Sequence, residues 1–451
     1  RFSFLKIKHF TSRYYSSALY ITGDKAQKTF VVLTPVIDFE KHLINKNKVV
    51  KNIRVRGLKI DFDDIVKQWT FFQEVSKRKH LLELNRQDIA QKITNLLKKS
   101  DTDPSEVEKY KVHAKIVKDD LKNLKISFYD IEEATMLKIL SLPNDLHSQT
   151  LSHEETVLYT HLNQPKNDSL DHITIGTDNN FVKYLNPYAC YLKSDAALLE
   201  LNLLGYFRKM LLESGYFQFS NPNFCRTVIY EGCVEVDQTK KKVFDVLEHD
   251  HDEDNLNRLH LCGSGSLMSF MAYFARHALH QVALPLRFFS VGKVYQPIKD
   301  EEPPSFLNLS QQSVVSIFNA DLEDTIRSVD KVVSEIRRIY NSLGCHYRIV
   351  ILPACKIENS ESLHISIQMY SNFKKEYVEV GNVCFYDTYV SKRLLFTYSF
   401  NKDKKYPKII AGSLINVHKF LACTLENIAS ENNVNLNASL KKKFEEINNV
   451  C

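Results

Sequence analysis

The chain of 451 residues is 44% hydrophobic and 25% charged, which is enough to bury one large core or two modest ones and excludes a disordered protein. No run approaches the roughly 18 apolar residues that cross a bilayer, so no membrane partner is expected. The net charge of +6 is uneven, because residues 41–128 carry 21 bases and 12 acids whereas residues 129–451 carry 33 bases and 39 acids. A basic element on an acidic body is typical of proteins that bind nucleic acid.

Residues 1–36 are predicted to be a targeting-like or flexible segment. The first 23 residues contain four bases and no acid, and they are rich in Ser, Tyr and Phe. This composition is typical of a mitochondrial targeting peptide, with an ordinary basic terminus as the alternative. We therefore expect a location in the mitochondrial matrix. The nine cysteines include no C-x-x-C pair, which fits free thiols in a reducing compartment better than disulfides or a zinc site.

Residues 37–144 are predicted to be an N-terminal domain with a helical-hairpin arm. Its two helices flank a polar turn at Lys98–Pro104. The first helix, Ile65–Leu97, has a rough apolar stripe. In the second helix, seven apolar residues recur at alternating spacings of four and three, namely Tyr110, Ala114, Val117, Leu121, Leu124, Phe128 and Ile131. The heptad pattern and the short turn predict an antiparallel coiled coil.

Lysines repeat the same spacing beside this seam, at Lys111, Lys115, Lys118, Lys122 and Lys125. They predict a continuous cationic ridge along the arm. Such a row is often only a solvated face that keeps a coiled coil soluble. The alternative is a surface for tRNA or another structured RNA, and the acidic body favours it.

Residues 145–451 are predicted to be a second domain of the α+β class. A helical pattern at Ala197–Leu211 leads into a turn and a strand near Phe217. Later segments such as Leu363–Tyr370 and Tyr377–Cys384 are short, β-rich and separated by polar breaks. The connections are too short for repeated parallel crossovers. The pattern therefore predicts a mainly antiparallel sheet flanked by helices.

The stretch Leu284–Ile298, LPLRFFSVGKVYQPI, resembles motif 2 of the class II aminoacyl-tRNA synthetases, most closely the seryl enzymes. In that family the strand ends in Phe-Arg-Gln-Glu, where this chain reads Tyr295, Gln296, Pro297 and Ile298. Residues 300–326 contain six acids and no Lys or Arg. Activation of an amino acid with ATP needs cations, because charge builds up on the phosphates.

Further landmarks follow the order of seryl-tRNA synthetases over nearly the whole chain from about residue 37. They are Asn52–Leu58, Leu142–Asn144, Asp171–Gly176, Tyr191–Glu200, Gly412–Leu414 and Leu425–Asn427. The resemblance implies a class II catalytic domain, with an antiparallel sheet and flanking helices. It also implies a coiled-coil arm that contacts tRNA across a dimer.

The motif 1 helix and strand of this family, which form its dimer, correspond to Leu198–Phe224. The resemblance implies that the interface includes Leu198, Leu201, Phe207, Phe219 and Pro222. The predicted partner is the catalytic mitochondrial seryl-tRNA synthetase, in a heterodimer, with a homodimer as the alternative.

The resemblance also places the family's reaction centre on residues that lack its chemistry. The Thr-x-Glu that holds the serine ammonium falls on Ser264–Ser266, with Ser264 and Ser266 in place of the Thr and Glu. The other substituted positions are Gln296 for the motif 2 arginine, Ile298 for the following glutamate, Val314 for a magnesium-binding carboxylate, Phe385 for an asparagine and Lys419 for the motif 3 arginine. Glu379, the second magnesium-binding carboxylate, and Ser413 are retained. Lysine keeps the charge of arginine but loses its planar stacking surface.

Two other segments have weaker interpretations. Glu248–Asp254 contains two His and five acids that could ligate a divalent metal, but a solvated loop is the preferred interpretation. Gly263–Ser266 is glycine-rich without the Lys of a phosphate loop, and it is interpreted as part of the eroded centre. We expect no bound metal and no cofactor.

The degeneracy resembles that of the insect mitochondrial seryl-tRNA synthetase-like proteins, a group of noncatalytic paralogues. The sequence therefore predicts a catalytically inactive paralogue that acts in mitochondrial translation through RNA binding. Two alternatives stay open, an active but divergent mitochondrial seryl-tRNA synthetase and an adenylating enzyme with another acceptor.

Overall fold

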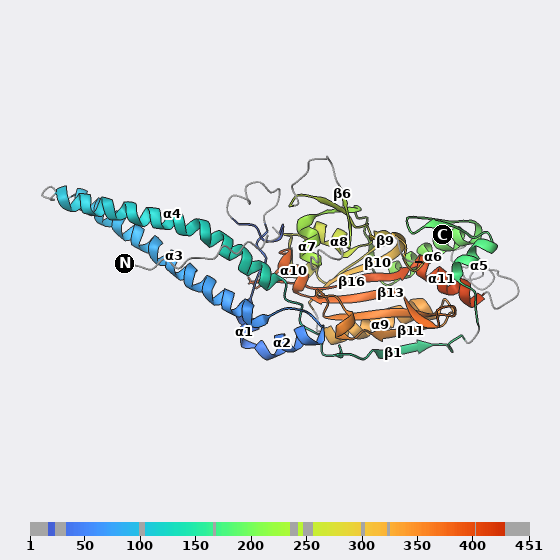
Figure 1. Cartoon of the computed structure of the whole chain (residues 1–451). Helices are drawn as coiled ribbons and strands as arrows, with labels where there is room; N and C mark the ends of the chain where they lie inside the picture. Colours follow the sequence, from blue (N-terminus) through green and yellow to red (C-terminus); the bar gives the residue numbers. More distant parts are fainter. Residues whose placement is uncertain are drawn as a thin grey trace. The chain divides into compact units, whose positions relative to one another are not determined.

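A computed structural model of the chain is shown in Figure 1. The residues that it describes are 17–22, 33–98, 104–165, 168–234, 242–246, 256–298, 303–322, 325–401 and 403–428. They form two compact units, of which the first contains Asp61–Ser141 and the second contains Leu33–Ile60 and the chain from Leu142 onwards. The predicted domain of residues 37–144 therefore divides near Asp61.

Most of the predicted targeting segment lies outside the described residues. The described parts are residues 33–36, which belong to the second unit, and the stretch 17–22, which belongs to the first unit. Leu19 is buried there, and the hydroxyl of Tyr20 donates to Glu132 Oε1 at 3.0 Å. This stretch packs on the arm instead of forming a flexible tail.

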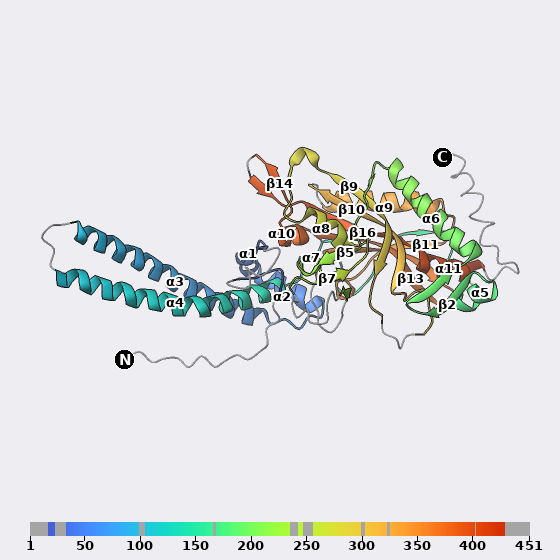
Figure 2. The same ribbon diagram turned by 90° about the horizontal axis from the view of Figure 1, so that it is seen from above.

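The first unit is a hairpin of two long helices, α3 (Phe62–Leu97) and α4 (Pro104–Leu140), which lie side by side in Figure 2. Asp61 caps α3 by accepting from two backbone N–H groups of the first turn. The seam buries Phe72 against Phe128, with ring centroids 5.7 Å apart. Val117 is also buried, at its heptad position. The prediction of two long helices paired as an antiparallel arm is confirmed.

The second unit is built around an eight-stranded sheet in the order β1-β11-β12-β13-β16-β10-β9-β4. All neighbouring strands are antiparallel except β4 and β9, which are parallel. The strands are β1 (Thr156–His161), β4 (Phe217–Gln218), β9 (Leu286–Tyr295), β10 (Gln311–Asp321), β11 (Tyr347–Ile351), β12 (Leu363–Ser371), β13 (Glu376–Asp387) and β16 (Lys408–Asn416). The predicted antiparallel sheet is confirmed.

Smaller elements complete this unit. The short strands are β2 (Val182–Asn186), β3 (Ala189–Leu192), β5 (Phe224–Arg226), β6 (Phe244–Val246), β7 (Leu259–Leu261), β8 (Ala278–His280), β14 (Thr397–Phe400) and β15 (Asp403–Lys405). The helices are α1 (Phe39–Ile44), α2 (Lys46–Val55), α5 (His172–Asp178), α6 (Ser194–Glu213), α7 (Thr227–Cys233), α8 (Leu267–Phe274), α9 (Thr325–Asn341), α10 (Tyr389–Arg393) and α11 (Val417–Ile428). Within the described residues, no helix is long and apolar enough to cross a membrane.

The two faces of the sheet are covered by different helices. One face packs against α6, α9 and α11, and it buries Val315, Ile317, Val383 and Phe385 in the main core. On the other face Phe318 of β10 stacks on the α8 rings of Phe270 and Phe274, in each case with centroids 5.2 Å apart. Because side chains alternate along a strand, residues one position apart on β10 or β13 serve opposite faces.

Arg56 ties the segment after α2 to the loop that precedes β12. Its guanidinium is buried and donates to Asn52 Oδ1 at 2.9 Å and to the carbonyl oxygens of Asn144, Glu358 and Glu361 at 3.2, 2.7 and 2.7 Å. These bonds fix the loop that carries Glu361.

We expect Arg56→Ala to lower the free energy of unfolding by about 3 kcal/mol or more, because several buried acceptors lose a charged donor. Chemical denaturation followed by circular dichroism measures this change. Arg54→Ala is the matched control, since Arg54 is exposed in the last turn of α2, two residues before Arg56, and its removal should cost less than about 0.5 kcal/mol. An equal effect of the two substitutions would contradict the stabilising role of the Arg56 hydrogen bonds.

Candidate functional site

A cavity of about 180 Å³ lies between α8 and the strands β9, β10, β13 and β16. Its lining residues are Gly265, Ser266, Leu267, Phe270, Val294, Ile317, Glu361, Asn382, Cys384, Tyr386, Ala411, Gly412 and Ser413. No Lys or Arg is among these described residues. Ligand pockets for drug-sized molecules usually measure about 300–1,000 Å³, so this cavity is small for a nucleoside triphosphate.

The glycine-rich turn Gly263–Ser266 borders the cavity. Its four backbone N–H groups already have acceptors, because Gly263 donates to the Asn223 carbonyl, Ser264 to Asn223 Oδ1, Gly265 to the Lys293 carbonyl and Ser266 to the Gly263 carbonyl, at 2.9 to 3.1 Å. A phosphate-binding turn instead directs free N–H groups at its ligand. This turn therefore lacks the donors that would hold a phosphate.

The sheet packs tightly against the same turn. A Cβ added to Gly265 would lie 2.4 Å from Val314 Cγ2, and one added to Gly292 would lie 1.9 Å from Ser264 Oγ. Val314 is itself buried. Where the family resemblance places a magnesium-binding carboxylate, this chain has an apolar side chain that fills the space behind the turn.

Glu379 is held by three donors on β12 and β13. Its Oε2 accepts from His364 Nε2 at 3.0 Å and from Ser366 Oγ at 2.6 Å, and its Oε1 accepts from Asn382 Nδ2 at 3.0 Å. Burial alone would raise the pKa of Glu379, but these hydrogen bonds and the charge of His364 outweigh burial and lower its pKa to about 2. The carboxylate is ionised, and its oxygens are already used.

A β-bulge places Glu379 and Asn382 within hydrogen-bond reach. The pairing of β12 with β13 shifts register between Ile367 and Gln368, so Glu379 and Asn382 come to one side although they are three positions apart. Asn382 Oδ1 also accepts from the N–H of Ser413 at 3.2 Å, and Ser413 Oγ lies 2.9 Å from Ser316 Oγ. Retained Glu379 and Ser413 are thus joined through Asn382.

Two features of the site were not predicted from the sequence, namely Asn382 and a second group beside the cavity, formed by Glu361, His364 and Cys384. His364 and Cys384 are direct partners on adjacent strands. Their approach depends on the register of β12 and β13, which periodicity alone does not specify. The one local signal was the Glu-x-x-His spacing of Glu361 and His364.

His418 contributes no positive charge to this region at neutral pH. Burial, together with the smaller effect of nearby Lys293, lowers the pKa of His418 to about 4 against the opposing effect of Glu200. Its Nδ1 lies 3.4 Å from the N–H of Ser313. The neutral ring therefore acts as a buried acceptor.

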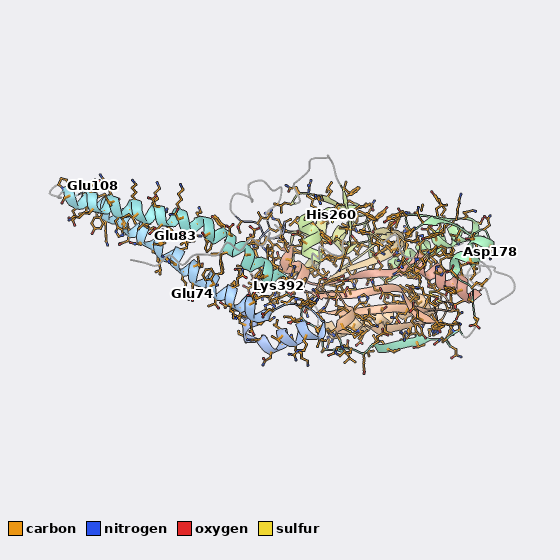
Figure 3. The ribbon with its side chains drawn as sticks, in the orientation of Figure 1. Glu74, Glu83, Glu108, Asp178, His260 and Lys392 are labelled. Carbon is orange, nitrogen blue, oxygen red and sulfur yellow. The ribbon has the colours of Figure 1, made fainter. Side chains whose placement is uncertain are left out.

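The cationic ridge lies on one helix of the arm. All five lysines, Lys111, Lys115, Lys118, Lys122 and Lys125, are exposed on α4. Glu108, labelled in Figure 3, lies next to Lys111 with a 3.6 Å ion pair between highly exposed groups. Such a pair contributes little and leaves the lysine available to a stronger anion. Glu74 and Glu83, also labelled, belong to α3.

The predicted dimer element presents apolar side chains to solvent. Leu198 and Leu201 on α6 are 45% and 67% exposed, Phe217 on the edge strand β4 is 70% exposed, and Pro222 is exposed. Phe219 is half-buried and stacks on Phe270, with centroids 6.1 Å apart.

The interface prediction is wrong for Phe207. This side chain is fully buried in the core of its own subunit, where its ring lies 5.6 Å from that of Tyr340. A helix that presents one face to a partner must bury the other, and Phe207 is on the inner face.

Known proteins share both the sequence pattern and the fold. The family model of the tRNA synthetase class II core domain (G, H, P, S and T) matches residues 252–428. The chain is 26% identical over 435 residues to the serine–tRNA synthetase-like protein Slimp of Drosophila melanogaster, which covers 95% of this chain and 92% of that protein. It is 20% identical over 385 residues to the mitochondrial serine–tRNA ligase of Bos taurus, which covers 80% of this chain and 73% of that protein.

Two solved structures have a similar fold. Seryl-tRNA synthetase from Pyrococcus horikoshii, complexed with ATP, superposes with a TM-score of 0.75 at 15% identity, covering 87% of this chain and 94% of that one. Cytoplasmic serine–tRNA ligase from Naegleria fowleri, in complex with AMP, gives a TM-score of 0.74 at 15% identity, covering 89% of this chain and 95% of that one. The chain is similar in sequence to serine–tRNA ligases and a synthetase-like protein, and it has the fold of the seryl-tRNA synthetases. The resemblance predicted from motif 2 and the ordered landmarks is confirmed.

In this seryl-tRNA synthetase-like chain, the cavity collects only two of the predicted site positions, Ser266 and Ser413. Ser266 caps α8, with its Oγ accepting from the N–H of Ser269. Gln296 follows β9 and is exposed, and its N–H donates to the Ser310 carbonyl at 2.9 Å. The carbonyl of half-buried Ile298 accepts from the Tyr188 hydroxyl at 3.1 Å.

Two further positions do not line the cavity. Phe385 is fully buried in the core on the α11 side of the sheet, whereas its neighbour Cys384 lines the cavity. The assignment of Phe385 as a site position is therefore wrong by the parity of β13. Lys419 is half-buried in the first turn of α11 and is not a lining residue. The loop Glu248–Asp254 lies outside the described residues.

Proposed function

We propose that this chain is a catalytically inactive mitochondrial relative of seryl-tRNA synthetase, which acts by binding structured RNA and by associating with the active mitochondrial enzyme. The cavity beneath α8 is the main observation that supports the loss of catalysis. Within the part of the chain that the structure describes, its lining has no cation and its bordering turn has no free backbone donor. Aminoacyl adenylate formation needs such groups, because negative charge builds up on the triphosphate in the transition state.

The acidic groups of the site also disfavour the binding of a triphosphate. Glu361 lines the cavity and Glu379 lies directly behind Asn382. A triphosphate would meet carboxylates without the arginines that normally neutralise it. Retained Glu379 is already engaged by His364, Ser366 and Asn382, so it offers little to a magnesium ion on ATP.

RNA binding is supported by the arm. The exposed lysines of α4 repeat every three or four residues, which matches one face of a helix and gives a linear array of positive charge. Relatives named as serine–tRNA ligases act on tRNA, so a seryl tRNA of the organelle is the favoured ligand.

Association with a second subunit is supported by α6 and β4. Their exposed leucines and phenylalanine form an apolar surface on an element that pairs in the family. A mitochondrial location is supported by the basic composition of residues 1–23 and by the name of the bovine relative.

Serine-dependent exchange of pyrophosphate into ATP tests the proposal. We expect exchange at the background level of the assay, with serine and with every other amino acid. Exchange that depends on serine would support an active divergent synthetase. Exchange that depends on another amino acid would support an adenylating enzyme with a different acceptor.

A further inference from the structure

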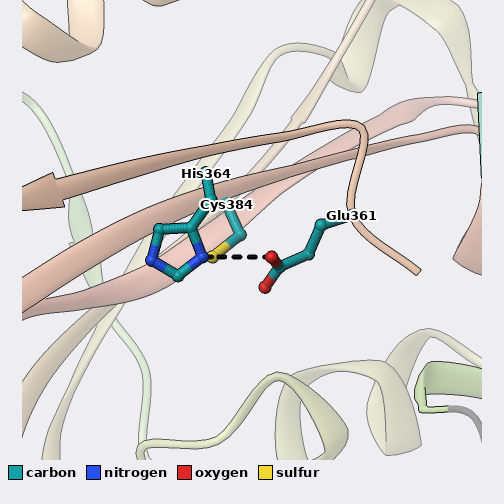
Figure 4. Close-up of side chains that lie close together, drawn as sticks. All are labelled: Glu361, His364 and Cys384. Atoms are coloured by element: carbon teal, nitrogen blue, oxygen red, sulfur yellow. Dashed lines mark hydrogen bonds and ion pairs between the residues drawn. The ribbon is translucent and has the colours of Figure 1, made fainter. Parts of the chain in front are cut away.

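Glu361, His364 and Cys384 lie close together, as Figure 4 shows, and Glu361 and Cys384 line the cavity. Their ligand atoms all lie within 4.8 Å of one another. His364 Nδ1 is 3.0 Å from Glu361 Oε2 and 3.3 Å from Cys384 Sγ. One nitrogen, one oxygen and one sulfur donor therefore surround a single point, and none of the three residues belongs to the predicted synthetase positions.

The other side of the imidazole is already fixed. His364 Nε2 donates to Glu379 Oε2 at 3.0 Å, and Glu379 is in turn held by Ser366 and Asn382. Histidines that bind metals commonly donate their second ring N–H to a carboxylate, which sets the tautomer and orients the ring. Here Nε2 donates to Glu379, and Nδ1, which shares a proton with Glu361 in the metal-free site, is the ring nitrogen nearest Glu361 and Cys384.

The carboxylate ligand is positioned as firmly. Glu361 Oε2 accepts from the N–H of Glu358 at 3.1 Å, and the Glu361 carbonyl accepts from buried Arg56 at 2.7 Å. Cys384 comes from the central strand β13, directly across from His364. All three side chains are thus placed by regular structure or by buried hydrogen bonds, as a built site requires.

Glu361 and Cys384 also line the cavity of about 180 Å³, together with Asn382, Tyr386 and Ser413. A water molecule in that space could complete a four-coordinate sphere. Three protein ligands with an open fourth position is the pattern of zinc sites that keep an exchangeable ligand.

We propose that Glu361, His364 and Cys384 bind one Zn²⁺ ion that faces this cavity, with Glu379 as the positioning residue behind His364. The thiol loses its proton on binding, and a proton shared by His364 Nδ1 and Glu361 is released with it. A thiolate ligand disfavours Mg²⁺ and Ca²⁺, which take oxygen ligands. The two positive charges of the ion balance the charges of the carboxylate and the thiolate. The zinc site does not depend on the proposed loss of catalysis.

The test uses the full-length chain, purified, stripped with a chelator and then titrated with Co²⁺ and Zn²⁺. We expect about one metal ion per chain. The cobalt form should show a thiolate-to-cobalt charge-transfer band in the near ultraviolet and the visible bands of tetrahedral Co²⁺, and Zn²⁺ should displace both. Absence of the charge-transfer band in the folded wild-type chain would overturn the proposal.

Variants assign the ligands. Cys384→Ser should remove the charge-transfer band, and Glu379→Gln should weaken Zn²⁺ binding by about 10–100-fold while keeping the band. Cys355→Ser is the matched control, because Cys355 is an exposed free thiol on the same unit and its replacement should change neither. Circular dichroism checks that each variant is folded. If Cys384→Ser does not fold, the wild-type cobalt spectrum and the effect of Glu379→Gln decide the outcome. A band that survives in folded Cys384→Ser would also overturn the assignment.

Discussion

Replacing Lys111, Lys115, Lys118 and Lys122 by Glu weakens binding of a structured RNA by at least about 100-fold near physiological salt. The reason is that each lysine–phosphate ion pair releases a counterion when it forms, and the reversed charge repels the backbone as well. The slope of log affinity against log salt should fall by about 0.7–0.9 for each lysine–phosphate ion pair that the substitutions remove. Fluorescence anisotropy with a labelled seryl tRNA, measured at several salt concentrations, gives both quantities.

The control reverses four exposed lysines on the second unit, Lys183, Lys374, Lys404 and Lys405. It changes the net charge equally without touching the arm. We expect this variant to bind RNA nearly as the wild-type chain does. Equal effects of the two variants would mean that only net charge matters. An unchanged affinity in the ridge variant would leave the lysines with a role in solubility alone.

Replacing Leu198 and Leu201 by Glu should weaken subunit association by about 10³-fold or more. Burying a leucine side chain contributes about 2 kcal/mol, so two of them account for about three decades in the dissociation constant, and a buried unpaired carboxylate adds to the effect. Co-expression with the catalytic mitochondrial seryl-tRNA synthetase, followed by light scattering at micromolar concentration, measures the assembly.

Leu81 and Leu97 serve as controls, because they are 65% and 66% exposed on the arm, much like Leu201. Their replacement by Glu should leave the assembly unchanged. If the two wild-type chains remain separate homodimers, the heterodimer is wrong and self-association is the better account. If the α6 variant assembles as well as the control, α6 is not the interface.

Local periodicity was sufficient to predict the arm. The heptad spacing from Tyr110 to Ile131 depends only on neighbouring turns of one helix, and the buried positions Val117 and Phe128 follow it. The antiparallel sheet was predicted for a similar reason, since short strands with short connections leave few other topologies.

The candidate site was less predictable, because it depends on pairings between strands far apart in sequence. The bulge between β12 and β13 decides that Glu379 reaches Asn382, and the register decides that His364 meets Cys384. The error at Phe385 has the same origin, since one position along a strand exchanges the core for the cavity. Phe207 shows the equivalent limit on a helix, where an apolar stripe does not tell which face a partner covers.

The most direct test of the central claim is serine-dependent pyrophosphate exchange, run beside the active mitochondrial enzyme under identical conditions. The account predicts background exchange for this chain and for Gln296→Arg. A single restored arginine is not sufficient, because the cavity still lacks the carboxylate of Thr-x-Glu and Val314 still fills the space behind the turn. Each absent electrostatic group costs about 10²–10³ in rate. Serine-dependent exchange above background by the wild-type chain, abolished when the retained Glu379 is replaced by Gln, would contradict it.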